Sequence, residues 1–239
     1  MSSSNTIVVI PARMASTRLP GKPLADIHGK PMIAWVVGLA QAAKVGPVLV
    51  AAAEAEIAAA ARAAGAEAVL TDPALPSGSD RVHAAIEAFD PGRRYGIVVN
   101  LQGDMPTMRA EDIARAVAVL ERGGDIATLV SPSTDPADRD NANVVKAIRA
   151  ADGRCLAFTR APAPHGPGPI ERHVGIYVYR RHALDQFVAA PPSPLEQREN
   201  LEQMRALELG MTIRADAIVD FPMGVDSRVD LEAARAALR

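Results

Sequence analysis

Four cationic side chains lie close together near the start of the chain, in a loop that follows a short apolar run. Residues 7–10 are apolar and β-branched, which predicts a buried β-strand that ends at Pro11. The loop carries Arg13, Arg18, Lys22 and Lys30, and no helix is expected before Pro31. Such a loop after a buried strand is how α/β proteins present phosphate-binding groups at the carboxyl edge of a sheet. We therefore expect a phosphate site, rather than solvated loop charges, because three prolines fix the loop: Pro11, Pro20 and Pro23.

Two aspartates are candidates for a metal site. Asp104 follows an apolar run in the sequence Gln102-Gly103-Asp104, and Asp226 stands far along the chain in Gly224-Val225-Asp226. A carboxylate at the carboxyl end of a parallel strand is well placed for Mg²⁺, which proteins hold with one or two carboxylates plus substrate phosphates and water. The alternatives are a turn role for Asp104 and helix capping for Asp226, since Ser227 and Asp230 lie at the start of the last expected helix.

Further polar residues suit a polyhydroxy acid. His173 and Tyr177 are four residues apart on an expected strand, so they lie on the same face, although such a pair also occurs in ordinary packing. Glu202 and Gln203 lie on an expected helix with a capping box. For Glu202 the alternative is an exposed ion pair with Arg198, which contributes only about 0.3–0.5 kcal/mol.

Two more cations stand beside loops. Residues 77–81, Ser-Gly-Ser-Asp-Arg, join a loop to a helix, where backbone N–H groups and Arg81 are able to hold a nucleotide. The alternative is plain helix capping by Ser79 or Asp80. Arg160 precedes a loop rich in proline and glycine at residues 161–169, and it is suited to a bidentate pair with a substrate carboxylate.

The elements that must position these residues alternate through the first half of the chain. After the first strand, strands are expected at residues 47–50, 68–70 and 97–101, and helices at 32–41, 55–64, 80–89 and 110–120. This alternation predicts an α/β fold with a mostly parallel sheet covered on both faces.

The pattern changes after about residue 126. Strands are expected at residues 126–130, 144–148, 156–159, 174–179 and 212–218, with few helices between the first four. Pro191 and Pro192 end one helix, the capping box at Ser193 begins another that continues to Leu209, and residues 228–238 form a closing helix. We expect one domain, residues 1–239, with a smaller α+β insertion at about residues 131–192.

Composition excludes several classes of function. The 239 residues include 26 basic and 28 acidic residues, and aromatic residues make up 3%, so neither a global field nor a stacking surface favours nucleic acid. A single cysteine, Cys155, excludes an internal disulfide and a cysteine-rich zinc site, and it is expected to be a small core or surface residue. Residues 1–5 do not resemble a signal peptide, and no apolar run reaches the roughly 18 residues that span a bilayer. A cytoplasmic protein without membrane partners is expected.

Taken in order, the motifs resemble one family. They are PARMASTRLPGKPLADIHGKPMI, SGSDR, NLQGDMP, FTRAPAP, RHVGIYVYR, SPLEQRENLEQMRAL and GVDSRVDLE, and together they cover nearly the whole chain. This set resembles the 3-deoxy-manno-octulosonate (Kdo) cytidylyltransferases, or CMP-Kdo synthetases. The first motif alone is shared with other nucleotidyltransferases, whereas the later ones are specific to the Kdo enzymes and their closest relatives.

The resemblance implies a Rossmann-like nucleotidyltransferase (α/β/α) that forms CMP-Kdo and pyrophosphate from CTP and Kdo with Mg²⁺, for lipopolysaccharide synthesis. It implies that Arg13 and Lys22 neutralise the triphosphate and that Asp104 and Asp226 hold Mg²⁺, and these four are the expected catalytic residues. The implied nucleotide site is Pro11, Ala12, Arg13, Arg18, Lys22, Ser77, Gly78, Arg81 and Gln102. The implied sugar-acid site is Gln102, Arg160, His173, Tyr177, Glu202 and Gln203. The α+β insertion would form a homodimer.

The chain departs from the family pattern at three places. Ala51-Ala52-Ala53 stands where Ala-Thr-Asp is common, so a polar pair at the strand edge is lost, although Glu54 follows directly. Met105 replaces a frequent acidic residue, and Ser227 a usual threonine. Two alternatives to the Kdo reaction stay open: a related acid sugar as acceptor (8-amino-Kdo or a nonulosonic-type acid), and a catalytically silent nucleotide-binding homologue.

Overall fold

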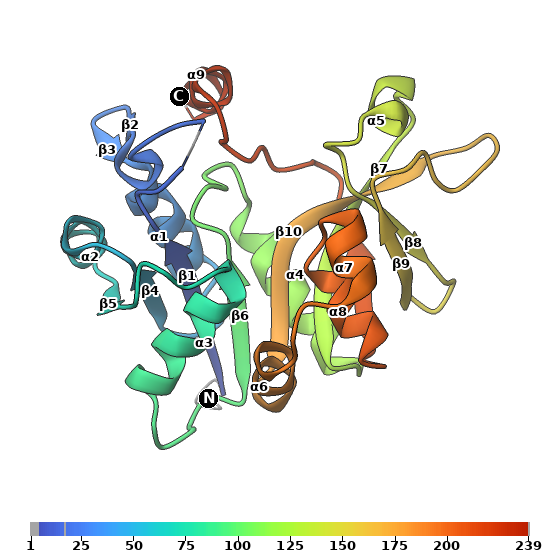
Figure 1. The fold of residues 1–239 in the computed structure, drawn as a ribbon. Helices are drawn as coiled ribbons and strands as arrows, with labels where there is room; N and C mark the ends of the chain where they lie inside the picture. Colours follow the sequence, from blue (N-terminus) through green and yellow to red (C-terminus); the bar gives the residue numbers. More distant parts are fainter. Residues whose placement is uncertain (1–4, 17, 239) are drawn as a thin grey trace. The chain divides into compact units, whose positions relative to one another are not determined.

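The computed structural model describes residues 5–16 and 18–238, and it divides the chain into two compact units (Figure 1). The first unit is Met1–Ala114 with Pro222–Arg239, and the second is Arg115–Phe221. The expected insertion at about residues 131–192 lies inside the second unit, and its role in dimerisation stays a prediction. Residues 1–4, most of the segment in which a signal peptide was not expected, lie outside the described part.

The sheet of the first unit is parallel, in the order β6–β1–β4–β5 (Figure 1). These strands are β1 (Thr6–Ala12), β4 (Val48–Ala52), β5 (Glu67–Leu70) and β6 (Ile97–Leu101). Every residue of β1 and β4 is buried, as is typical of parallel strands covered on both faces. The predicted mostly parallel α/β fold is confirmed.

The helices of this unit connect parallel strands. They are α1 (Met32–Ala42), α2 (Ala55–Ala63) and α3 (Gly78–Phe89), with α9 (Arg228–Ala237) near the carboxyl end of the chain. Right-handed crossovers place α1 and α2 on one face, since the chain moves from β1 to β4 to β5 in one direction. The return from β5 to β6 places α3 on the other face.

The first strand is longer than predicted. It continues through Pro11 to Ala12, which pairs with Ala52 of β4, whereas pairing with β6 is last seen at Val9 and Asn100. Proline lacks a backbone N–H, so a strand tolerates it where one neighbour has already ended. The prediction that the strand ends before Pro11 is therefore wrong, and the cationic loop begins at Arg13.

The cationic loop also contains short elements that were not predicted. A 3₁₀-helix, η1 (Lys22–Leu24), follows Gly21, and β2 (Asp26–Ile27) pairs with β3 (Lys30–Pro31) before α1. Gly21 has a φ of 71°, a left-handed conformation that glycine adopts at little cost. Its N–H donates to the carbonyl of Met14 at 3.2 Å, which closes the loop immediately before Lys22.

The second unit has a mixed sheet around the long strand β10 (Figure 1). Its strands are β7 (Ile126–Ser133), β8 (Lys146–Arg149), β9 (Cys155–Thr159), β10 (Ile170–Arg180) and β11 (Ile213–Ala217). β10 is antiparallel to both β7 and β8, β8 is antiparallel to β9, and β11 is parallel to β7. Strands thus occur in every segment where they were expected, and Cys155 is buried in β9.

One predicted helix of the second unit is broken. Residues 194–209 were expected to form a single helix, but α7 (Pro194–Glu199) and α8 (Gln203–Glu208) are separated at Asn200, whose φ is 53°. Asparagine tolerates this left-handed conformation better than most residues, so it ends α7 in the way that glycine ends many helices. The predicted capping box at Ser193 and Glu196 is present.

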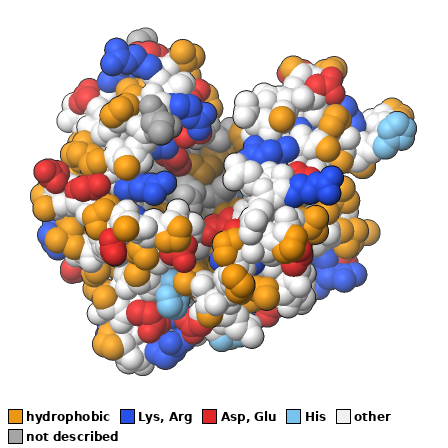
Figure 2. All heavy atoms as spheres, viewed as in Figure 1, with side chains coloured by type: hydrophobic (Ala, Val, Ile, Leu, Met, Phe, Trp, Pro, Cys, Tyr) orange, Lys and Arg blue, Asp and Glu red, His pale blue; other side chains and the backbone are white. Residues whose placement is uncertain are grey.

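The remaining helices of the chain are α4, α5 and α6. α4 (Ala110–Glu121) crosses the boundary between the two units, α5 (Pro136–Asp140) was not predicted, and α6 (Arg181–Ala189) ends just before Pro191 as expected. Among the helices within residues 5–16 and 18–238, none combines the length and the apolar character that a membrane span requires. On the face drawn in Figure 2, acidic and basic side chains are interspersed, in keeping with the near-neutral net charge of −2.

Candidate active site

A pocket of about 690 Å³ opens in the first unit at the carboxyl ends of β1 and β6. Ligands of open α/β sheets bind at this edge, and the volume falls within the roughly 300–1,000 Å³ of small-molecule sites. All the predicted nucleotide-binding and metal-binding residues line it: Pro11, Ala12, Arg13, Arg18, Lys22, Ser77, Gly78, Arg81, Gln102, Asp104 and Asp226. The structure thus brings these residues together, and the contact that each makes with a ligand stays a prediction.

Two strand ends that line the pocket pack closely against each other. Gly103 follows β6, and a Cβ added there would lie 2.9 Å from the carbonyl oxygen of Pro11. Real side chains do not approach a backbone oxygen so closely, so only glycine fits without a shift of the strand ends. Gly103 therefore allows Gln102 and Asp104 to flank the end of β1.

Lys22 lies between the two candidate metal ligands. Its ammonium group donates to Asp104 Oδ2 at 2.6 Å and to Asp226 Oδ1 at 3.1 Å. Arg18 reaches the other oxygen of Asp226, with 3.0 Å between Nη2 and Oδ2. Burial acts to lower the pKa of Lys22, but attraction and hydrogen bonds from Asp104 and Asp226 outweigh it and raise the pKa above its usual value. Lys22 is therefore a fixed, fully charged cation.

Three hydrogen bonds between distant segments bring Asp226 beside Asp104. The carbonyl of Asp104 accepts the N–H of Val225 at 2.9 Å. Thr107 accepts the N–H of Met223 at 2.8 Å and donates to the carbonyl of the same residue at 3.3 Å. Asp226 does not cap α9, because Ser227 and Asp230 form a capping box there. The capping alternative for Asp226 is therefore wrong, and its carboxylate contacts Lys22 and Arg18 instead.

An apolar cluster holds the last helix against the cationic loop. Its buried members are Leu19, Ile27, Met32, Val225, Leu231 and Ala234. Arg235 of α9 also donates to the carbonyl of Asp26 at 2.6 and 2.9 Å. The segment that carries Asp226 is thus packed on the same cluster as the loop that carries Lys22.

The start of α3 forms another wall of the pocket. Ser77 is the N-cap, since its hydroxyl accepts the N–H of Asp80, so the helix begins earlier than predicted and neither Ser79 nor Asp80 caps it. Arg81 is only 2% exposed and donates to Thr71 Oγ1 at 2.7 Å and to the carbonyl of Asp72 at 3.0 Å. Arg81 thus orders the preceding loop while it lines the pocket.

Gln102 is held by a short relay of side chains. Its Nε2 donates to Asn100 Oδ1 at 2.8 Å, and Asn100 Nδ2 lies 3.4 Å from Ser79 Oγ. Asn100 and Ser79 are each 1% exposed. The relay ties the end of β6 to the first turn of α3 and fixes the amide of Gln102 at the pocket wall.

The other predicted sugar-acid residues belong to the second unit. Arg160 follows β9, and each of its side-chain nitrogens donates to a backbone carbonyl: Nε to Glu199 at 2.9 Å, Nη1 to Ala142 at 2.9 Å and Nη2 to Asn200 at 3.2 Å. Lys146 is fully buried and donates to the carbonyl of Arg160 at 3.2 Å, a contact that the sequence did not suggest. Arg160 therefore ties β9 to the end of α7.

His173, Tyr177 and Glu202 are neighbours within the second unit. The rings of His173 and Tyr177 have centroids 5.4 Å apart, and His173 Nε2 lies 3.0 Å from Thr128 Oγ1. Burial lowers the pKa of His173 to about 3, so the ring is neutral near pH 7. Burial, followed by the nearby Tyr179 and Glu202, raises the pKa of Tyr177 well above its usual value. Gln203 is buried at the start of α8. A role for these residues in sugar binding stays a prediction.

Sequence reasoning missed several residues of the pocket and its support. Ala15, Ser16 and Pro23 also line the pocket, and Thr107 fixes the segment before Asp226. The signal available for the first three was their place in the cationic loop. A lone threonine that bonds to a segment more than a hundred residues away leaves no local pattern in a sequence.

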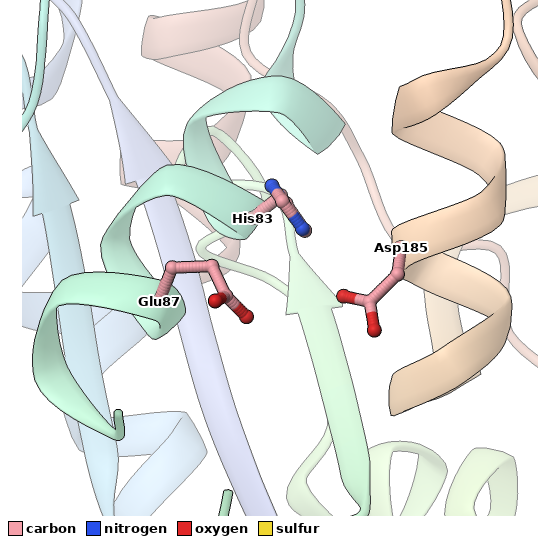
Figure 3. A group of neighbouring side chains, drawn as sticks. All are labelled: His83, Glu87 and Asp185. Carbon is pink, nitrogen blue, oxygen red and sulfur yellow. The ribbon is translucent and has the colours of Figure 1, made fainter. Parts of the chain in front are cut away.

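Metal-binding residue types also occur on α3 outside the pocket lining. His83 and Glu87 lie one turn apart on this helix, and Figure 3 draws them with Asp185 of α6 in the second unit. Glu87 pairs with Arg93 at 3.3 Å. One histidine and one glutamate on a helix face do not complete a metal site, so the metal prediction stays with Asp104 and Asp226.

Cations at the carboxyl ends of parallel strands, with two carboxylates among them, are typical of a protein that binds nucleoside phosphates. A family model described as Cytidylyltransferase matches residues 7–213, so the chain belongs to the cytidylyltransferase family. It is similar to the 3-deoxy-manno-octulosonate cytidylyltransferase of Rhodospirillum rubrum, with 57% identity over 100% of this chain and 97% of the relative. The enzyme of the same name from Parvibaculum lavamentivorans is 56% identical over 99% and 93% of the two chains.

A solved structure agrees with these relatives. It is CMP:2-keto-3-deoxy-manno-octonic acid synthetase complexed with CTP, which matches this chain with a TM-score of 0.92 at 34% identity and covers 98% of both chains. The resemblance predicted from the motifs is therefore confirmed, and the chain is a nucleotidyltransferase.

Proposed function

We propose that this enzyme transfers CMP from CTP to the anomeric hydroxyl of Kdo and releases pyrophosphate. The observation that carries the proposal is the pocket in which Arg13, Lys22, Asp104 and Asp226 meet, in a chain whose full-length relatives bear the name of this activity. In the reaction, a bond forms between the sugar oxygen and the α-phosphorus, the bond to the pyrophosphate oxygen breaks, and the hydroxyl proton is lost to solvent.

The charge of the pocket suits a triphosphate. Arg13, Arg18, Lys22 and Arg81 stand against Asp104 and Asp226, so cationic side chains exceed acidic ones in the lining. Phosphoryl-type transfer depends mainly on positioning and on charge stabilisation, so no covalent nucleophile is required. We propose that Lys22 and Arg13 neutralise the triphosphate and the departing pyrophosphate, and that Ser77, Gly78 and Arg81 lie against the rest of the nucleotide.

Mg²⁺ is part of the proposal, and the donor set fits it. Asp104 and Asp226 offer carboxylate oxygens, and both already contact one cation, the ammonium group of Lys22, at 2.6 and 3.1 Å. Mg²⁺ takes one or two protein carboxylates and fills its other positions with phosphate oxygens and water. When bound, it would neutralise phosphate charge and make the sugar hydroxyl easier to deprotonate.

The acceptor site is proposed to include Gln102, Arg160, His173, Tyr177, Glu202 and Gln203. Gln102 is in the pocket lining, and the amide fixed by Asn100 supports its role. The other five support the proposal through the motifs they share with the Kdo enzymes. We further propose that the protein acts as a homodimer in the cytoplasm, where CTP is available, and that it supplies CMP-Kdo for lipopolysaccharide synthesis.

A pyrophosphate-release assay tests the proposed function. Purified protein is incubated with CTP and Mg²⁺ and with Kdo, 8-amino-Kdo or a nonulosonic acid in turn. Kdo is expected to give the highest kcat/KM, and a control without an acceptor acid is expected to release no pyrophosphate. A higher kcat/KM with another acid would show that this acid, and not Kdo, is the preferred acceptor. CTP binding without release for any acid would leave only a silent nucleotide-binding protein.

A further inference from the structure

Glu54 stands at the start of α2 but does not cap it. It occupies the N-cap position, yet its side chain makes no capping hydrogen bond to α2. Its Oε2 instead accepts the N–H of Met14 at 2.9 Å, across 40 residues of sequence. The carboxylate thus contacts the cationic loop immediately after Arg13.

Met14 is a point at which the loop is closed. Its N–H is held by Glu54, and its carbonyl accepts the N–H of Gly21 at 3.2 Å, directly before Lys22. Fixing Met14 therefore restrains two cations of the pocket: Arg13, which precedes Met14 in the chain, and Lys22, which follows the bonded Gly21.

The end of β4 offers no other polar side chain for this contact. Ala51, Ala52 and Ala53 are buried and apolar, and this strand end reaches β1 through a backbone bond from Ala53 N–H to the carbonyl of Ala12 at 2.9 Å. A bond from an N–H to a carboxylate is roughly twice as strong as one between neutral groups. Glu54 therefore supplies the polar anchor that this alanine-rich strand end lacks.

The charge of Glu54 also acts on the pocket. Burial is the main cause that lowers the pKa of Arg81, repulsion from Arg13 lowers it further, and Glu54 and Asp72 oppose both. The charge of Glu54 therefore favours the protonated form of Arg81 and offsets part of the effect of Arg13.

We propose that Glu54 is a positioning residue for nucleotide binding, which holds the cationic loop through the Met14 N–H so that Arg13 and Lys22 face the triphosphate. The proposal rests on the proposed CTP-dependent function. It adds that the hydrogen bond from Met14 to residue 54 contributes more to CTP affinity than the negative charge of Glu54 does. An uncharged acceptor at this position is therefore expected to preserve most of the CTP affinity.

Three variants separate the anchor from its charge. Glu54→Ala removes the acceptor, Glu54→Gln keeps an acceptor oxygen without the charge, and Glu56→Ala removes an exposed acidic residue from the same turn as a matched control. In ligand-free protein, hydrogen exchange of the Met14 amide, followed by NMR, is expected to be at least about tenfold faster in Glu54→Ala, within about threefold of wild type in Glu54→Gln, where a weaker neutral bond remains, and unchanged in Glu56→Ala. Equal acceleration at the Ala53 amide would show fraying of the strand end and overturn the proposal.

CTP affinity is the second readout. Calorimetry with CTP and Mg²⁺ is expected to give a Kd about tenfold higher for Glu54→Ala, within threefold of wild type for Glu54→Gln and within twofold for Glu56→Ala. The KM for the acceptor acid is expected to stay within twofold in all three. A wild-type Kd for Glu54→Ala, or a Glu54→Gln variant as weak as Glu54→Ala, would contradict the proposed anchor.

The wild-type protein alone also decides the matter if Glu54→Ala does not fold. A Met14 amide that exchanges at the rate of an unprotected loop amide in wild-type protein would overturn the proposal. If wild-type protein instead protects Met14 but binds no CTP, the proposed function fails while the anchor stands. The two failures are therefore distinguishable.

Discussion

Lys22 contacts both candidate metal ligands of the site. Its ammonium group joins Asp104 from the end of β6 to Asp226 from near the end of the chain. Two carboxylates this close repel each other, and a shared cation offsets that repulsion. A metal ion bound by the same carboxylates would also offset their repulsion. Asp104 and Asp226 are thus arranged to hold a cation, which is Lys22 in the protein without nucleotide.

Removing either carboxylate charge tests this arrangement. Asp104→Asn and Asp226→Asn are each expected to lower turnover at least about tenfold, or about 1.4 kcal/mol of barrier, because each loses a ligand of the proposed Mg²⁺. Asp26→Asn, at an exposed position of β2, is the matched control and is expected to retain wild-type turnover. Steady-state rates at limiting Mg²⁺ decide: wild-type turnover in either site variant rules out its metal role.

Because His173 is buried, the free energy of unfolding is expected to depend on pH. The folded chain keeps its ring neutral down to about pH 3, whereas the unfolded chain binds a proton below about pH 6.5. Since the unfolded state binds more protons between these values, the stabilisation is complete above pH 6.5 and is lost as the pH falls toward 3.

The variant His173→Gln isolates this contribution. Between pH 7 and pH 5, the unfolding free energy of wild-type protein is expected to fall by about 2 kcal/mol more than that of the variant. Glutamine keeps a polar group near Thr128 but has no titrating ring. Urea unfolding at the two pH values gives the comparison, and equal losses for both proteins would show that His173 is not buried in its neutral form.

At the scale of the elements, local sequence anticipated most segments and missed those set by tertiary structure. The strand at 97–101 and the start of α1 are where hydrophobic periodicity places them. Proline normally breaks a strand, but β1 passes through Pro11 because its neighbour has ended there. The break at Asn200 was missed because the surrounding residues favour a helix, while the backbone of Asn200 takes a left-handed turn.

Gly103 tests the packing of the two strand ends. Gly103→Ala is expected to destabilise the fold by about 1–3 kcal/mol, because the added methyl group must displace the Pro11 carbonyl. Turnover is expected to fall as well, since Gln102 and Asp104 move with the strand end. Gly92→Ala is the control, because a Cβ there meets nothing within 4 Å. Thermal unfolding and turnover are measured together, and a variant indistinguishable from Gly92→Ala in both would refute the tight contact.

At the scale of the whole molecule, the motifs anticipated one half of the site more fully than the other. Sequence reasoning placed the cationic loop, residues 77–81 and both aspartates in one site. Arg13, Arg18 and Lys22 of the loop, Ser77, Gly78 and Arg81, and both aspartates share one pocket, whereas Lys30 is not in its lining and lies over the ring of Trp35. The sequence did not show which hydrogen bonds hold these residues in place. Glu54 accepts from Met14, Thr107 accepts from Met223, and Arg81 donates to its preceding loop. These are side chains bonded to backbone groups, and such bonds leave no repeat or spacing in a sequence.

The proposed homodimer has a direct test. The chain has a mass of 25.1 kDa, and sedimentation equilibrium is expected to report about twice that value at micromolar concentration. Deletion of charge at the catalytic pocket, as in Asp104→Asn, is expected to leave the mass unchanged. A single species at the monomer mass under the conditions of the activity assay would exclude the dimer as the active form.

The proposed reaction requires the anomeric oxygen of Kdo to attack the α-phosphate of CTP. Kdo labelled with ¹⁸O at its anomeric hydroxyl is incubated briefly with CTP, Mg²⁺ and the enzyme, and the products are analysed by mass spectrometry and ³¹P NMR. CMP-Kdo is expected to carry the label in the bridge between sugar and phosphorus, and the pyrophosphate is expected to be unlabelled. Free CMP without CMP-Kdo, or product without the bridging label, would contradict it.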